Sequence, residues 1–303
     1  MALNKFKYVG RDRVENLLKQ QQIRFTQPDA LNDPFEMKRF RERHIQETMP
    51  ALWMAPVTAT GLIMDQITEH PTAMPVDAAI RARNEILESS VKFIAGMLGT
   101  SMPYRKEEIL DKQKQAYEFI DKMDRYGILS MTQHPDNLLM WAHYANEHRG
   151  VVFEIDLENE AFCADFTKGS VPYTDKNADE WRGDVQYRKK RATPPTSYED
   201  FIASLFLKSP QWSYEAEYRI VRPVERGRKI PATEGTSHDI YLFPLPACCI
   251  KRLIFGVRSD NDFRNHIASI ISRNPEELGH IELSQAQLRQ DAYGLEITPF
   301  TAL

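Results

Sequence analysis

The stretch WSYEAEYRIV, residues 212–221, predicts a β-strand with two glutamates and an arginine at alternate positions. Side chains on a strand alternate between its two faces, so Glu215, Glu217 and Arg219 are expected to share one face. Two interpretations of that face are open. It is an ordinary sheet face with a carboxylate–guanidinium pair, or it presents two carboxylates and a guanidinium to a substrate.

Hydrophobic periodicity on both sides of this stretch predicts an alternation of strands and helices. Strands are expected at 6–9, 23–27, 127–131, 151–156, 170–173, 184–188, 251–257, 280–288 and 295–299. Helices are expected at 12–22, 138–148, 201–209 and 260–273. Residues 37–125 show only helical spacing, so they predict a helical insertion or subdomain within a single domain, 1–303. The expected class is α+β with a mixed or antiparallel sheet.

Composition limits the classes of protein to consider. The chain has 303 residues and a formal net charge of −4, which does not indicate a dedicated nucleic-acid binder. Its three cysteines include an adjacent pair and no C-x-x-C motif, so a disulfide framework or structural zinc site is not expected. The N-terminus lacks the apolar core of a signal peptide, and no apolar run approaches the length of a membrane span. We therefore expect a soluble, cytoplasmic protein with no membrane partner.

The stretch NLLMWAHYANEHRG (137–150) predicts an aromatic-rich helix that starts at a capping residue and stops before Gly150. Trp141 and Tyr144 at helical spacing are typical of a core, and His143 is typical of a structural hydrogen bond. The alternative is that His143 or Tyr144 contacts a nucleotide by hydrogen bonding or stacking.

The stretch LNDPFE (31–36) predicts an ordered turn anchored by its phenylalanine. A functional alternative places Asn32, Asp33 or Glu36 at the rim of a pocket.

The chain contains no P-loop, no G-x-G-x-x-G fingerprint, no G-x-S-x-G elbow and no kinase motif set. The large enzyme classes that these motifs define are therefore excluded.

Four of these motifs, LNDPFE, LLMWAHYANEHRGVVFEID, KSPQWSYEAEYRIV and RLIFGV, occur in the order seen in a bacterial and phage family. The chain resembles domain of unknown function family 2971 from about Phe6 to Val257, with the middle helical region covered least. This resemblance carries no activity with it.

The opening KY…NLL…IRFTQPDALNDP is similar to the beginning of ADP-ribosyltransferase-like folds. The resemblance implies a split sheet around an NAD site, with NAD as substrate and a glutamate that steadies the oxocarbenium ion as nicotinamide leaves. By this analogy Glu217 is catalytic and Glu215 orients an acceptor. Pocket-lining roles fall to Tyr8, Trp141, His143 and Tyr144, with Arg219 holding the glutamates or a phosphate. The chain departs from the analogy at Lys7–Tyr8, where a His or Arg is expected, and it lacks a Ser-Thr-Ser element.

Three hypotheses follow. The first is an ADP-ribosyltransferase-like enzyme or NAD glycohydrolase, acting on a protein, a nucleic acid or water in a toxin or phage-defence system. The second is a non-enzymatic sensor that binds a nucleotide or a phage component. The third is a metal-dependent nuclease that uses Asp33, Glu36, Glu215 and Glu217 to bind magnesium.

Overall fold

The computed structural model describes residues 4–33, 125–164, 166, 168–170, 178–190, 198–233 and 238–300. All of them belong to one compact unit, Met1–Phe40 and Lys122–Leu303. The helical insertion expected at 37–125 lies outside the described residues except for its last position. Among the described helices, none is long and apolar enough to cross a membrane.

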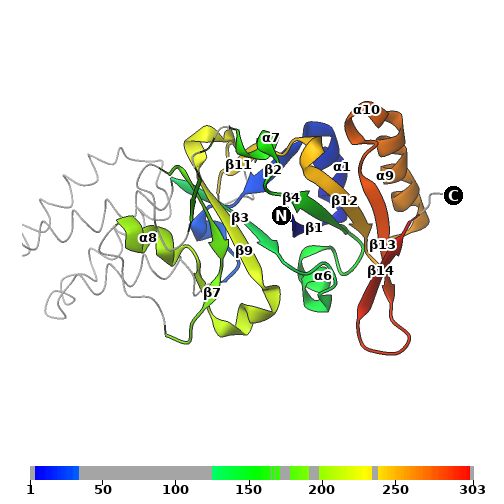
Figure 1. Ribbon diagram of the computed structural model, residues 1–303, viewed down its shortest axis with the longest axis horizontal. Coiled ribbons are helices and arrows are strands. Elements are labelled where there is room, and N and C mark those ends of the chain that lie inside the picture. Colours follow the sequence, from blue (N-terminus) through cyan, green and yellow to red (C-terminus); the bar gives the residue numbers. More distant parts are fainter. Residues whose placement is uncertain are drawn as a thin grey trace, which may run out of the picture. The chain divides into compact units, whose positions relative to one another are not determined.

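Nine of the described strands form one sheet, in the order β14-β13-β12-β4-β1-β3-β9-β6-β5 (Figure 1). Most neighbours are antiparallel, while the pairs β12–β13 and β5–β6 are parallel. Smaller sheets are formed by β10-β11-β2 and by β7-β8. The strands are β1 (Asn4–Val9), β2 (Gln22–Phe25), β3 (Tyr126–Thr132), β4 (Val151–Asp156), β5 (Lys168–Ser170), β6 (Glu180–Asp184), β7 (Gln186–Tyr187), β8 (Leu207–Lys208), β9 (Glu217–Pro223), β10 (Arg228–Ile230), β11 (Ile240–Pro244), β12 (Ile250–Phe255), β13 (Glu282–Leu288) and β14 (Leu295–Pro299). The predicted α+β class with a mixed, largely antiparallel sheet is confirmed.

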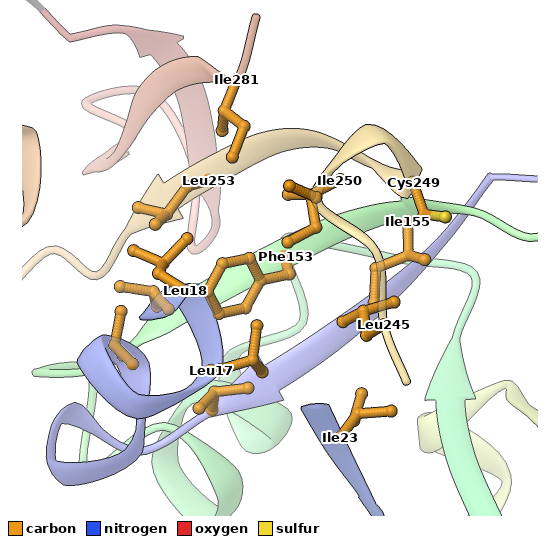
Figure 2. Packing of buried hydrophobic residues seen from close by; sticks show 14 of the residues in the cluster. Leu17, Leu18, Ile23, Phe153, Ile155, Leu245, Cys249, Ile250, Leu253 and Ile281 are labelled. Atoms are coloured by element: carbon orange, nitrogen blue, oxygen red, sulfur yellow. The ribbon is translucent and has the colours of Figure 1, made fainter. Parts of the chain in front are cut away.

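Helices cover both faces of the large sheet. Because successive strand residues point to opposite faces, Val152 and Phe153 of β4 enter two different hydrophobic clusters. Phe153 packs with Leu17 and Leu18 (Figure 2). The described α-helices are α1 (Arg11–Gln20), α6 (Leu138–Tyr144), α7 (Glu160–Cys163), α8 (Tyr198–Ser204), α9 (Asn261–Arg273) and α10 (Pro275–Leu278). Helices α1 and α9 therefore cover one face of the sheet, and α6 packs on the other (Figure 1).

The large sheet is weakly joined between β1 and β3. The two strands share one register pair, Phe6↔Thr132, whereas β1 pairs with β4 along its whole length. Further back along β3, Ile128 bonds instead to Thr26, which follows β2. The edge of β3 between Ile128 and Thr132 is thus left outside the ladder of β1, and we call this stretch the β3 opening.

The prediction of a strand over residues 212–221 is wrong for the first half of that stretch. Residues Pro210–Glu215 form a 3-10 helix, η3, with Pro210 in its first turn. Proline fixes its own φ in the helical range and is favoured at that position. Ala216 then adopts φ 41, in the left-handed region, and β9 starts at Glu217. Glu215 therefore does not share a strand with Glu217 and Arg219.

The helix expected at 138–148 also ends early. Asn137 caps α6 as predicted, accepting hydrogen bonds from the N–H groups of Leu139 and Met140. The helix stops at Tyr144, because Asn146, Glu147 and His148 take positive φ of 50°, 52° and 68°. Few residues other than glycine adopt this conformation, and three in succession turn the chain sharply into β4.

The helix expected at 201–209 is replaced in its second half by a strand. Helix α8 ends at Ser204, and Leu207–Lys208 pair in parallel with Gln186–Tyr187. The strand expected at 184–188 is also divided. Strand β6 ends at Asp184, and Gln186–Tyr187 form the separate strand β7, which pairs with β8. The tertiary pairing overrides the local helical pattern and fixes Lys208 beside Glu217, the first residue of β9.

Candidate functional site

The candidate site is centred on the ammonium group of Lys208, which is buried at the end of β8. Its Nζ lies 2.5 Å from Oε2 of Glu215 and 3.0 Å from Oε2 of Glu217. The same ammonium lies 4.9 Å from the centroid of the Trp212 ring, a cation–π contact. One lysine therefore joins the two carboxylates that the sequence analysis selected, although their backbones belong to different elements.

Glu217 is fully engaged by its neighbours. Arg219 holds it in a fork, with Nε 2.7 Å from Oε1 and Nη2 3.0 Å from Oε2, and the side chain of Ser130 adds a hydrogen bond. Burial alone would raise the pKa of Glu217, but the charges of Arg219 and Lys208 outweigh it and lower the pKa to about 2. The remaining guanidinium nitrogen of Arg219 donates to the carbonyl of Leu205 at 2.6 Å. For these two residues the interpretation as a structural ion pair fits the geometry.

Glu215 occupies a different position, between the ion cluster and the surface. The hydroxyl of Tyr144 donates to its Oε1 at 2.7 Å, and Lys208 holds its Oε2. Asn32, an exposed residue, donates from Nδ2 to the Tyr144 hydroxyl at 2.6 Å. Burial, followed by the hydrogen bond to Glu215 and its charge, raises the pKa of Tyr144, so this phenol stays protonated. A chain of hydrogen bonds thus runs from Asn32 at the surface through Tyr144 to Glu215.

Three aromatic side chains lie next to this chain, and we call them the aromatic row: His143, Tyr214 and Trp212. His143 is exposed, and the other two are half-buried. The ring centroids are 6.5 Å apart for His143 and Tyr214 and 6.1 Å apart for Tyr214 and Trp212. Asn137 fixes the row, because its amide donates to the carbonyl of Tyr214 at 2.5 Å while its oxygen caps α6. The row offers ring faces for stacking beside the carboxylate of Glu215.

Tyr8 and Trp141, also predicted to line the site, lie in the hydrophobic core beneath it. Trp141 has no exposed surface, and its indole N–H donates to the carbonyl of Pro135 at 2.8 Å. The hydroxyl of Tyr8 donates to the carbonyl of His134 at 2.9 Å and accepts from the N–H of Asn137 at 3.2 Å. These two side chains support the loop that leads into α6 and present no free group to a ligand.

The structure therefore brings five of the seven predicted residues together and adds four more, Lys208, Asn32, Trp212 and Tyr214. The five are Glu215, Glu217, Arg219, His143 and Tyr144. Lys208 lies within the motif KSPQWSYEAEYRIV but was given no role from the sequence, and Asn32 was placed only at a pocket rim. Glu36 lies outside the described residues. Within the described ranges, no group of three or more His, Cys, Asp or Glu side chains has the arrangement of a metal site.

Comparisons with known proteins support a family resemblance and nothing more specific. Residues 140–220 match the model of a family described as a protein of unknown function, DUF2971. No curated protein and no solved structure matches the chain. The resemblance to this family, inferred from the sequence motifs, is confirmed over that segment, which runs from α6 into β9. The segment holds Lys208, the two glutamates, Arg219, Tyr144 and the aromatic row, whereas Asn32, Ser130 and Asn137 lie outside it.

Proposed function

We propose that the protein binds a nucleotide through Glu215 and the aromatic row, and that the nucleotide is NAD. The observation that carries the proposal is the position of Glu215. Its carboxylate is buried against a lysine on one side and connected on the other, through a tyrosine hydroxyl, to an exposed amide, and the aromatic row begins beside that tyrosine. Few surface regions combine a fixed carboxylate with stacking faces, and the two together match the ribose hydroxyls and the base of a nucleotide.

Ribose recognition requires a hydrogen-bond acceptor that is held in place before the ligand arrives. Lys208 and Tyr144 fix both oxygens of Glu215, and each oxygen keeps a further lone-pair direction for a hydroxyl. Asn32 is exposed and supplies an amide oxygen as a second acceptor. A base stacked on Tyr214 or Trp212 adds sequence-independent affinity of about 1–3 kcal/mol.

With NAD bound, the chemistry proposed is cleavage of the bond between the ribose carbon and nicotinamide. Nicotinamide leaves with the bonding electron pair, and water or an acceptor group adds to the ribose carbon and releases its proton to solvent. A carboxylate beside the ribose stabilises the positive charge that develops at that carbon. Glu215 takes this role in the proposal, in place of Glu217, because Arg219, Lys208 and Ser130 together give the carboxylate of Glu217 four hydrogen bonds, whereas each oxygen of Glu215 accepts one. Cleavage of cellular NAD, or its transfer to a protein or nucleic acid, would suit a toxin or phage-defence effector.

The experiment measures NAD binding by calorimetry and nicotinamide release by chromatography with purified protein. Glu215→Gln should lower the release rate by about a hundredfold or more, the magnitude typical of removing one group that stabilises transition-state charge. Asn32→Ala changes an exposed side chain, so it tests ribose binding without risk to the fold, and it should weaken NAD binding. Glu225→Gln alters an exposed glutamate and serves as the matched control.

Two outcomes would contradict the role given to Glu215. Full turnover by a folded Glu215→Gln protein would remove the mechanism. Loss of turnover in a folded Glu217→Gln protein, with turnover retained in Glu215→Gln, would return the role to Glu217.

A second candidate function is a nucleotide-binding sensor without catalysis. It is favoured by the pairing of Glu215 with Lys208, since a carboxylate already neutralised by a lysine stabilises a cation less strongly. NAD binding that is weakened by Asn32→Ala, with no nicotinamide release, would establish this function in place of the enzyme.

A further inference from the structure

A run of three cations follows directly on strand β7. Arg188, Lys189 and Lys190 are consecutive, and all three are exposed. In the part of the chain that the structure describes, none of them pairs with a carboxylate, and the guanidinium of Arg188 donates to the amide oxygen of Gln186 at 2.7 Å. The formal net charge of −4 belongs to the whole chain, so these residues form a local concentration of positive charge. We call Arg188–Lys190 the basic segment.

Parallel strand pairing places the basic segment beside the candidate site. Tyr187 of β7 pairs with Lys208 of β8, and the N–H of Arg188 donates to the carbonyl of Lys208 at 3.0 Å. The hydroxyl of Tyr187 accepts from the N–H of Glu217 at 2.9 Å. The backbone at the start of the basic segment is therefore joined by hydrogen bonds to two residues of the ion cluster.

The same pairing brings the basic segment close to Trp212, one end of the aromatic row. Ser209 follows Lys208 and begins η3, where its carbonyl accepts from the N–H of Trp212 at 3.0 Å. Arg188 and Trp212 are thus separated by one strand spacing of about 4.8 Å and one 3-10 turn of about 6 Å. The backbones of these two residues lie roughly 8–11 Å apart, a distance that a few nucleotides of one strand can span.

Trp212 is held in place before any ligand arrives. It is half-buried, with the ammonium of Lys208 over its ring at 4.9 Å and the ring of Tyr214 at 6.1 Å between centroids. A ring that is already ordered loses little entropy when a base stacks on it. A base can stack on a protein side chain once it is free of its neighbours in a duplex. Exposed cations next to an ordered aromatic ring are the combination that binds single-stranded nucleic acids.

We infer that the basic segment and Trp212 bind a single-stranded nucleic acid, with phosphates at the three cations and a base on the indole ring. Tyr214 and His143 then remain for the base of NAD. Only the role of this strand as the acceptor rests on the proposed function. In that role a nucleophilic group of the strand adds to the ribose carbon, nicotinamide leaves with the bonding electron pair, and the proton of the nucleophilic group passes to solvent.

The first test follows the fluorescence anisotropy of labelled oligonucleotides of about 12 nucleotides, with DNA and RNA in separate titrations. Three phosphate contacts on a single strand predict that log K falls with log salt with a slope of about −2. The affinity should therefore drop about twentyfold between about 50 and 200 mM salt. Binding of either oligonucleotide supports the inference, and the tighter of the two identifies the class of strand.

The charge of the basic segment is tested by the double variant Lys189→Gln/Lys190→Gln. It leaves one contact, so the slope should fall to about −0.7 and the same change of salt should cost only about threefold in affinity. The matched control is Lys251→Gln/Arg273→Gln, which removes the same charge at two exposed positions on β12 and α9 and should keep the slope of the unaltered protein.

The contribution of stacking is tested separately from that of charge. Trp212→Leu keeps an apolar side chain and removes the ring, so it should weaken binding at least about fivefold without changing the slope. A duplex of the same sequence should bind less tightly than the single strand, because its bases are not free to stack.

Four results would overturn the inference. They are no oligonucleotide binding by the unaltered protein, the same slope in Lys189→Gln/Lys190→Gln as in its control, unchanged affinity in a folded Trp212→Leu protein, and binding of the duplex or of a polyglutamate peptide as tight as that of the single strand.

The two proposals fail separately. Oligonucleotide binding without NAD binding would overturn the nucleotide proposal and leave the nucleic-acid surface standing. Nicotinamide release by a protein that binds no oligonucleotide would do the reverse. With both bound, NAD labelled in its adenine should transfer the label to the strand, and turnover that leaves the strand unlabelled would exclude it as the acceptor.

Discussion

Replacement of Glu217 by glutamine tests whether this residue is mainly a structural anion. The variant keeps the shape of the side chain and removes the charge that Arg219 and Lys208 neutralise. Both cations are buried, so in the variant their positive charges would have less negative charge nearby to neutralise them. Removing one partner of a buried ion pair typically costs about 3–5 kcal/mol of the free energy of unfolding.

The pKa of Glu217 gives an independent magnitude. The gap between its ordinary value of 4.5 and about 2, at 1.36 kcal/mol for each pH unit, corresponds to about 3 kcal/mol. Because the folded-state pKa is the lower one, this stabilisation is fully present above about pH 4.5 and is lost as the pH falls to about 2. At pH 3, about 1.5 pH units of the gap have been lost, which corresponds to roughly 2 kcal/mol.

The assay is urea denaturation of the unaltered protein and of Glu217→Gln near pH 7 and near pH 3. The difference in free energy of unfolding should be about 2 kcal/mol smaller at the lower pH. Glu225→Gln, at an exposed position, should change the stability by no more than about 0.5 kcal/mol at either pH. A difference for Glu217→Gln that is the same at both pH values would refute the account of Glu217 as an ionised, buried partner of Arg219.

Two further substitutions test buried contacts elsewhere in the fold. Gly256→Ala should lower the free energy of unfolding by about 3 kcal/mol, because an added Cβ would lie 2.1 Å from the carbonyl oxygen of His148. Gly294→Ala, where the nearest atom is 3.4 Å away, should change it little in the same urea titration. Arg222→Met should cost about 3 kcal/mol, because Arg222 donates from Nε to the fully buried Glu180 at 2.5 Å. A melting temperature for Arg222→Met equal to that of the unaltered protein would show that Glu180 is compensated without it.

The strands that carry the core could be predicted from the sequence because burial on two faces imposes a pattern. VVFEID (151–156) forms β4 with the predicted bounds, and side chains on both of its faces are buried. LEITP (295–299) forms the edge strand β14, also with the predicted bounds, although only Leu295 in it is buried. Strands β10 and β11 were not predicted. Strand β11 pairs with β2, which lies far away in the sequence, as well as with the neighbouring β10, and such distant pairing leaves little local signal.

The candidate site could be predicted only in part, for two physical reasons. A local pattern does not distinguish a buried aromatic residue from one that lines a surface, so Tyr8 and Trp141 were assigned to the site although they lie in the core. The role of Lys208 depends on a parallel pairing between β7 and β8, which the helical pattern of 201–209 conceals. Pro210 was the available signal for the break before β9, since proline favours the first turn of a helix over a strand interior.

The two interpretations of the stretch 212–221 apply to different glutamates. The left-handed turn at Ala216 separates Glu215 from Glu217 and lets both carboxylates reach Lys208 from different elements. Glu217 lies on the strand, where Arg219 two residues later holds it in a fork and makes it part of the core. Glu215 lies at the end of a short helix, where its remaining contact is a tyrosine hydroxyl that leads to the surface. A regular strand would have placed both side chains in the same surroundings. The irregular backbone therefore allows one glutamate to stabilise the fold while the other remains near enough to the surface to bind a ligand.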